Sequence, residues 1–180
     1  MNFRKLIKFA FYMLLIMAVA NLCGCNKDNT ISFSTNINEV ITKINQNPNY
    51  SKYIDVIMKK PVILPIKDNQ GNQDPDNCHI SENLIFKNIT NEKIKFNCKI
   101  FLAKEFITSI AYAPTSFGLN QEITLEPGQS ADIAGAIIMK KIESLAGKEK
   151  DIYDEYSGKV YVELKINNDF YSFIQMINSN

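Results

Sequence analysis

The stretch "EKIKFNCKIFL", residues 92–102, alternates between polar and apolar side chains as far as Ile100. Its apolar residues recur at every second position and are Ile94, Phe96, Cys98, Ile100 and Leu102. Successive side chains of a β-strand point to opposite faces of the sheet. The stretch therefore predicts a half-buried strand, with one face in a core and the other in water.

Similar short runs lie on both sides of this stretch and are separated by turn residues. We expect about seven strands, at 62–66, 82–90, 93–103, 121–126, 130–138, 159–166 and 170–177. Turn residues near Thr90 predict a hairpin between the second of these strands and the third. Because no helix-length connection alternates with the strands, the pattern favours an antiparallel β-sandwich over an α/β fold.

The chain order from residue 80 to 177 resembles the immunoglobulin-like domains that are common in bacterial envelope proteins. The features that carry the resemblance are strands separated by an Asn-rich turn, by "LEPGQS" and by a closing hairpin. The resemblance implies a mainly β fold, an immunoglobulin-like antiparallel β-sandwich. The chain departs from antibody domains because it has no tryptophan, the usual marker of their core.

A helical segment is predicted before the sandwich. In "NINEVITKINQN" the apolar residues recur at helical spacing, and Asn36 and Glu39 are placed as a capping box. Residues 49–60 fit a second helix or, by their β-branched content, a strand. We therefore assign residues 36–60 to a helical segment and residues 61–180 to the β-sandwich domain.

The N-terminus has the three-part layout of an export signal. Three basic residues are followed by an uncharged apolar run and then by the small residues before Cys25. The uncharged run of about 17 residues is also near the lower limit for crossing a bilayer. A retained transmembrane helix and an ordinary secretory signal are therefore alternatives.

Residues Leu22 to Cys25, "LCGC", resemble the lipobox of bacterial lipoproteins. The lipobox has an aliphatic residue three positions before the modified cysteine and a glycine directly before it, whereas Cys23 replaces the usual small residue. The resemblance implies a signal peptide over 1–24, a lipid on the sulfur of Cys25, and a lipid-proximal tether over 25–35. It also implies a place in the cell envelope, on the outer side of the cytoplasmic membrane or in the outer membrane.

Charge and glycine content exclude several partners. Without the predicted signal, 17 basic residues face 19 acidic ones, which gives no basic field for nucleic acid. Phosphate-loop and dinucleotide glycine patterns are absent, so we expect no cofactor. We expect instead a membrane contact through the lipid anchor and an envelope protein or polymer as partner.

The polar loop 68–76 and His79 are weak candidates for a metal or catalytic site. The loop carries oxygen ligands of the kind calcium takes, but it lacks the glycine and the closing glutamate of a helix-loop-helix calcium site. His79 is the only histidine and lies in no recognisable nucleophile motif. We expect a solvated loop, a surface-loop histidine, no metal and no catalytic residue.

Cys78 and Cys98 are the thiols that remain outside the lipobox, and two thiols in an exported protein can form a disulfide. In the predicted hairpin Cys98 lies across from Leu84. The six residues from there to Cys78 span about 20 Å, whereas bonded Cα atoms lie within about 7 Å. A disulfide therefore requires residues 78–83 to fold back, and the alternative is two separate thiols with Cys98 in the core.

The loop "AYAPTSFGLN" places Tyr112 and Phe117 beside proline, serine and glycine. Exposed aromatic residues on such a loop are a common means of partner contact, although they can also fold back over the core. The sequence as a whole predicts a non-enzymatic binding or structural module held at a membrane. An inhibitor of an envelope enzyme is the alternative, and a hydrolase would need side chains that converge from distant positions.

Overall fold

The computed structural model describes residues 33–44, 46, 49–113, 116–119 and 121–177. The chain divides into two units, residues 1–32 and residues 33–180, and every described residue belongs to the second unit. The predicted signal peptide and Cys25 therefore lie outside the described residues.

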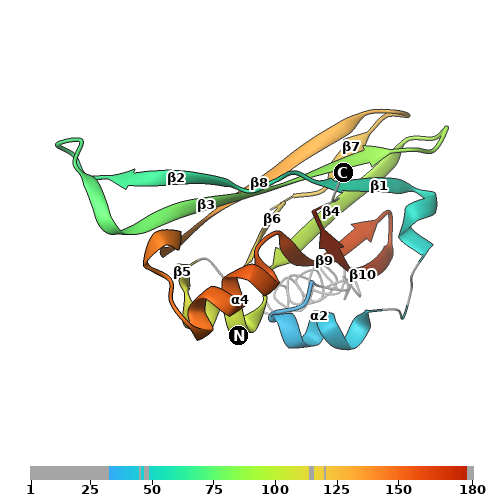
Figure 1. The fold of residues 1–180 in the computed structure, drawn as a ribbon. Coiled ribbons are helices and arrows are strands. Elements are labelled where there is room, and N and C mark those ends of the chain that lie inside the picture. The colour runs from blue at the N-terminus through green and yellow to red at the C-terminus, as the bar shows by residue number, and fades with distance from the viewer. Residues whose placement is uncertain (1–32, 45, 47–48, 114–115, 120, 178–180) are drawn as a thin grey trace, which may run out of the picture. The chain divides into compact units, whose positions relative to one another are not determined.

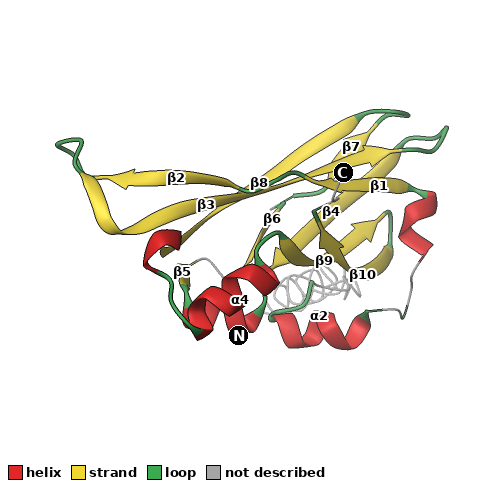
Figure 2. Ribbon diagram, viewed as in Figure 1, coloured by secondary structure: helices red, strands yellow, loops and turns green. Residues whose placement is uncertain are grey.

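Two antiparallel sheets are built from the strands of the described residues (Figure 2). Sheet A consists of β1 (Ile54–Met58), β2 (Val62–Lys67), β3 (Gln73–Asn88), β5 (Ala111–Ala113) and β8 (Ser130–Lys140). Sheet B consists of β4 (Ile94–Phe101), β6 (Ser116–Gly118), β7 (Ile123–Leu125), β9 (Lys159–Ile166) and β10 (Asp169–Met176). The strand order is β1–β3–β8–β5 in sheet A, where β2 also pairs with β3. It is β10–β9–β4–β6 in sheet B, where β7 also pairs with β4.

This order has the immunoglobulin-like topology. In constant-type immunoglobulin domains the first, second, fifth and fourth strands form one sheet, and the third, sixth and seventh form the other. Here β1 and β2 share the place of the first strand, followed by β3, β8 and β5, while β4, β9 and β10 form the core of the second sheet. The predicted mainly β, immunoglobulin-like antiparallel β-sandwich is confirmed.

Of the helices in the described residues, α2 (Ile37–Lys43) lies against sheet B, whereas α3 (Lys104–Ser109) contacts α4 (Lys148–Tyr156) and β5 of sheet A. The short 3-10 turns are η1 (Asn49–Lys52) and η2 (Ile142–Ser144). Helix α2 contacts β9 and β10, and Tyr50 of η1 stacks on Phe173 of β10 with ring centroids 3.9 Å apart. Figure 1 shows α2 on the side of sheet B that faces away from β1 and β3.

The core lies between the two sheets and follows the alternation that the sequence predicts. On β4 the side chains of Phe96, Cys98 and Ile100 are buried, and on β3 the even-numbered side chains from Cys78 to Asn88 are buried. The rings of Phe86 and Phe96 stack across the core at 5.3 Å. The prediction from residues 92–102 of a half-buried strand is therefore confirmed.

The predicted hairpin between β3 and β4 is wrong, because the two strands belong to different sheets. Asn88 fixes the connection: its side-chain N–H groups donate to the carbonyls of Glu92 at 2.8 Å and Leu125 at 3.1 Å. Its Oδ1 accepts from the Thr90 backbone N–H at 2.9 Å. These bonds turn the chain across the end of the sandwich, where a short loop can serve as a corner as readily as a hairpin.

Two further expectations need correction. Residues 54–58, assigned to a helical segment over 36–60, form strand β1, whereas residues 37–43 are helical. Strand β3 begins at Gln73, so the last residues of the predicted loop 68–76 already belong to the sheet. In both places strand pairing decides the structure, of β1 with β3 and of Gln73 with Lys67 of β2, and local propensity does not.

Candidate functional site

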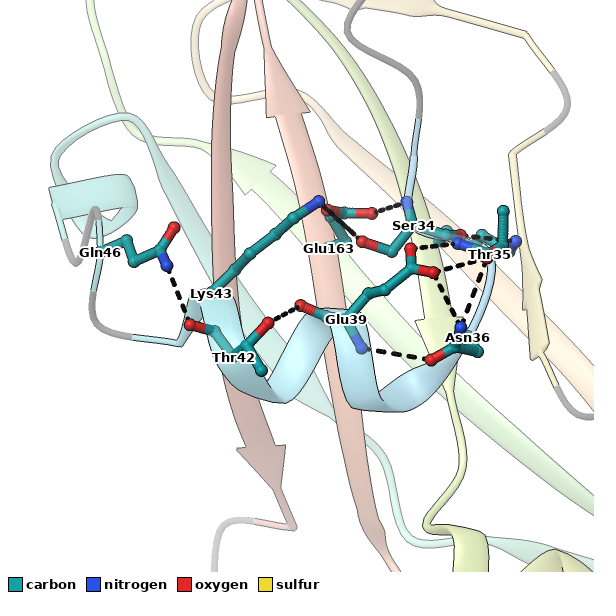
Figure 3. Close-up of polar contacts among 9 residues, drawn as sticks. Ser34, Thr35, Asn36, Glu39, Thr42, Lys43, Gln46 and Glu163 are labelled. Atoms are coloured by element: carbon teal, nitrogen blue, oxygen red, sulfur yellow. Dashed lines mark hydrogen bonds and ion pairs between the residues drawn. The ribbon is translucent and has the colours of Figure 1, made fainter.

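A cluster of polar side chains on the outer side of sheet B fastens the start of the domain (Figure 3). Its centre is Glu163 of β9, which has no exposed surface. The Glu163 carboxylate accepts hydrogen bonds from the Ser34 backbone N–H, from the Ser34 hydroxyl at 2.9 Å and from the Lys43 ammonium group at 2.8 Å. The Lys99 ammonium group donates to the Ser34 carbonyl at 3.0 Å. We call Ser34, Lys43, Lys99 and Glu163 the N-terminal clasp.

Local sequence explains why the clasp forms. The neighbours of Glu163 in β9 face the core, so Glu163 faces the opposite side, where α2 covers it. Helix α2 begins with the predicted capping box, in which Asn36 Oδ1 accepts from the Glu39 backbone N–H at 3.2 Å. Hydrogen bonds from Thr35 are the main cause of a lowered pKa for Glu39. Because a buried carboxylate is costly unless it is paired, the donors of the clasp are what allow Glu163 to be buried.

The outer face of sheet A differs, because its side chains on β1, β2 and β8 are largely exposed and those on β3 are mostly half-buried. The odd-numbered side chains of β3 and their neighbours on β1, β2 and β8 form this face. Two rows cross it, Val62–Ser81–Ala136 and Leu64–His79–Ile138. Val62, Leu64 and Ile138 are 55%, 48% and 37% exposed. Contiguous exposed apolar side chains are typical of an interaction surface.

Charges at one end of this face are balanced within the chain. Lys59 and Asp132 form an ion pair at 2.8 Å. Asp55 lies directly opposite Lys87 across β1 and β3. Exposed pairs of this kind add little stability. They do leave this end of the face with no net charge, because each positive side chain has a negative neighbour.

The free edge of sheet A is a poor template for an added strand. The Lys59 backbone N–H donates to the Asn83 carbonyl, so the odd-numbered residues of β3 point their backbone groups toward β1 and β2. Pro65 pairs with the even-numbered Cys78, so its nitrogen points outward, away from β3. Proline has no N–H to donate, and Pro61 directly precedes the same strand. A partner is therefore not expected to add a strand along β2.

Tyr112 and Phe117, the predicted partner-contact residues, lie in different sheets. Tyr112 of β5 lies at the margin of sheet A and is 57% exposed. It is near Lys140, and a hydrogen bond with Glu149 is the main cause of the raised pKa of Lys140. Phe117 of β6 is half-buried because its ring lies over Gly135 of β8, where a Cβ would come within 2.3 Å of the ring. Partner contact stays a prediction for both, and Tyr112 is the more exposed of the two.

Cys78 and Cys98 are free and buried in the structure. They lie on β3 and β4, which belong to opposite sheets. Burial raises the pKa of Cys98 to about 12. Burial is also the main cause of the raised pKa of Cys78. The structure thus has the arrangement of two separate thiols.

We expect both thiols to resist iodoacetamide in the native protein and to react in urea, because burial disfavours the reactive thiolate. Peptide mass spectrometry of unreduced samples would measure the alkylation of Cys78 and Cys98 before and after denaturation. A protein that took up no alkyl group at either position after denaturation without reductant would contain a disulfide and contradict the structure.

His79 and the loop 68–76 do not form a metal site in the structure. His79 lies within β3 between Leu64 and Ile138, so the prediction of a surface-loop position is wrong. The carboxylate of Asp68 accepts hydrogen bonds from the side chain and the backbone N–H of Asn72, both at 2.9 Å, and these lower its pKa. Over the described residues, no group of three or more metal-ligating side chains comes together.

Glu82 is a buried acid that sequence analysis missed. It lies on β3 among the side chains that face the core, opposite Gly135, and is 2% exposed. The Gly158 backbone N–H donates to its carboxyl group, whereas Oε2 has no hydrogen-bond partner among the described residues. Burial raises the pKa of Glu82 to about 7. The sequence does contain a signal for this acid: Glu82 stands at an even-numbered position of β3, between the apolar residues Ile80 and Leu84.

None of the described helices has the length and apolar character needed to cross a membrane. No protein-family model and no curated protein matches the chain.

Solved structures share a weak likeness with the chain. A FixG-related protein from Vibrio parahaemolyticus is 10% identical over 67% of this chain and 98% of its own, with a TM-score of 0.23. A protein from Archaeoglobus fulgidus is 9% identical over 66% and 92%, with a TM-score of 0.28. An uncharacterized β-sandwich protein from Clostridium difficile 630 is 8% identical over 71% and 89%, with a TM-score of 0.25. At these identities and TM-scores the likeness carries no argument about function.

Proposed function

We propose that the protein is a non-enzymatic binding or structural module of the cell envelope, held at a membrane by a lipid on Cys25. The observation that carries the binding role is the outer face of sheet A, which exposes Val62 and Leu64 on β2 and Ile138 on β8, with β3 between them. Tyr112 adds an exposed aromatic ring at the margin of the same sheet. Tyrosine is enriched among the few residues that supply most of the binding energy in protein interfaces.

The N-terminal clasp is consistent with a short anchor. Eight residues separate Cys25 from Ser34, the first residue of the clasp. An extended chain of that length spans at most about 28 Å. The clasp would therefore keep the sandwich close to the membrane surface.

The anchor is tested by replacing the modified cysteine. We expect the Cys25→Ala variant to leave the membrane fraction after a high-salt wash, because the remaining apolar run of the uncut signal is short and the acyl chains are lost. Fractionation of cells and mass spectrometry of the mature N-terminus measure this. A variant that stayed with the membranes would refute acylation as the anchor, and a Cys23→Ala variant is the control.

The binding role is tested by crosslinking in intact cells, followed by recovery of the full chain. We expect wild type to yield a reproducible crosslinked protein or glycan, and Leu64→Glu to reduce its yield at least about tenfold, because the glutamate would be buried in the contact. Ile41→Glu is the matched control, since Ile41 is 45% exposed but lies on α2. Recovery of lipid alone, or equal yields for both variants, would refute the proposal.

A further inference from the structure

We propose that the partner of the outer face of sheet A is a second copy of this chain, paired about a two-fold axis that runs along β3. The inference rests on the proposed function, because it names the partner of the same face.

The outer face of sheet A is complementary to itself under such a rotation. Turning one copy by 180° about an axis along β3 brings its β2 over β8 of the other copy. In the row Leu64–His79–Ile138, the aliphatic ends lie on either side of a polar centre. Leu64 of each copy then packs against Ile138 of the other, and His79 meets its own counterpart. A closed two-fold pair requires this kind of symmetry in a single patch.

The balance of charges does not exclude a second copy. A patch of one sign would repel an identical patch, since like charges would be brought together. Here the Lys59–Asp132 pair and the facing Asp55 and Lys87 balance the charges at one end, although Lys87 lies on the axis and meets its own counterpart. At the other end Lys140 is bonded to Glu149.

Unpaired polar atoms lie along the proposed axis. Among the described residues, His79 Nδ1 and Asn83 Oδ1 are buried without a hydrogen-bond partner. Both residues are odd-numbered members of β3 and therefore face outward. These two atoms are already covered within one chain, so they make the centre of the face polar but do not select a particular partner.

The size of the face suits a weak dimer. β3 and β8 pair over the positions from Asn77 to Lys87 of β3. With about 3.3 Å per residue and about 4.8 Å between strands, this length and three strands cover roughly 500 Å² in plan. Side chains that project from the sheet add accessible area to this figure. The area that the face could bury is then near the smallest area buried in specific interfaces, about 600 Å² per partner. Anchoring of both copies to one membrane would raise their effective concentration.

Sedimentation velocity of the full chain in mild detergent tests the pairing. We expect wild type to form dimers at about 100 µM, and Ile138→Glu to weaken dimerisation at least about tenfold. The matched control is Ile174→Glu, because Ile174 is also a strand isoleucine, 41% exposed, but lies on β10 of sheet B. A monomeric wild type, or equal weakening by both variants, would overturn the inference.

Disulfide trapping in membranes tests the position of the axis. Ser81 lies at the centre of the face, so the Ser81→Cys variant is expected to form a disulfide-linked dimer under mild oxidation. Ser144→Cys, on the exposed turn η2, is the control and is expected to give at least about tenfold less dimer. Equal trapping at both positions would exclude the proposed axis.

The two proposals fail in different ways. If wild type sediments as a monomer while Leu64→Glu abolishes crosslinking to another molecule in cells, self-pairing is wrong and the binding module stands. If wild type is monomeric and Leu64→Glu changes no crosslink, both proposals are wrong.

Discussion

Replacing Glu82 with glutamine is expected to raise the free energy of unfolding by about 3 kcal/mol at pH 8 and by far less at pH 5. Glu82 faces the core from β3 and is 2% exposed. Burial raises the pKa of Glu82 from 4.5 to about 7, since a charged carboxylate is poorly solvated there. The magnitude follows because a tenfold change in an ionisation equilibrium corresponds to about 1.4 kcal/mol.

The direction of the pH dependence follows from the raised pKa. The folded state favours the neutral acid, so its contribution to stability is fully present below pH 4.5, the ordinary pKa of the group. That contribution is lost as the pH rises through the folded pKa of about 7. The glutamine variant does not titrate there, so its stability should not fall over this range for that reason.

Urea unfolding at pH 5 and pH 8 measures the difference between Glu82→Gln and wild type. Glu92→Gln is the matched control, because Glu92 is exposed in the loop between β3 and β4. The control is expected to differ from wild type by less than about 0.5 kcal/mol at both pH values. A Glu82→Gln protein no more stable than wild type at pH 8 would show that Glu82 is not buried as the structure has it.

Replacing Glu163 with leucine is expected to lower the free energy of unfolding by about 2 kcal/mol and to release the segment from Ser34 to Lys43. The change removes the acceptor of the Ser34 backbone N–H, the Ser34 hydroxyl and the Lys43 ammonium group. Ser34 is buried, so its donors would lose their partner without gaining water. Lys43 is 38% exposed and can be hydrated again, which keeps the loss below that of a fully buried pair.

Hydrogen exchange of residues 34–44 separates this local effect from global destabilisation. We expect these amides to lose protection in Glu163→Leu, while those of β3 and β4 keep theirs under native conditions. Glu39→Gln serves as the control, because Glu39 is a half-buried acid of the same segment and acts only within the cap. Unchanged exchange of residues 34–44 in the leucine variant would show that Glu163 does not hold the segment.

The sandwich was predictable wherever a strand was long and regular. The alternation around Phe96 and Cys98 predicts the core face of β4, and the capping box at Asn36 and Glu39 predicts the start of α2. The corner at Asn88 was not predictable, because its side chain bonds Leu125, which is distant in sequence. Strands of three residues, such as β5 and β6, are too short to show a period.

The candidate site was predictable only in part. The sequence drew attention to Tyr112, which is exposed, and to Phe117, which covers Gly135. The outer face of sheet A combines residues from β2, β3 and β8 that only strand pairing brings together. Local patterns carry no information about that register, so no inspection of "PVILPI" alone could place Leu64 beside His79.

Pro65 of β2 and Pro61, directly before that strand, have a consequence for how copies of the chain can associate. A sheet with an exposed edge strand can add strands from further chains through backbone hydrogen bonds. Repeated addition of this kind builds fibrils. Pro61 and Pro65 remove hydrogen-bond donors from the edge at β2, since neither residue has a backbone N–H. Growth of a ladder from β2 is thereby disfavoured.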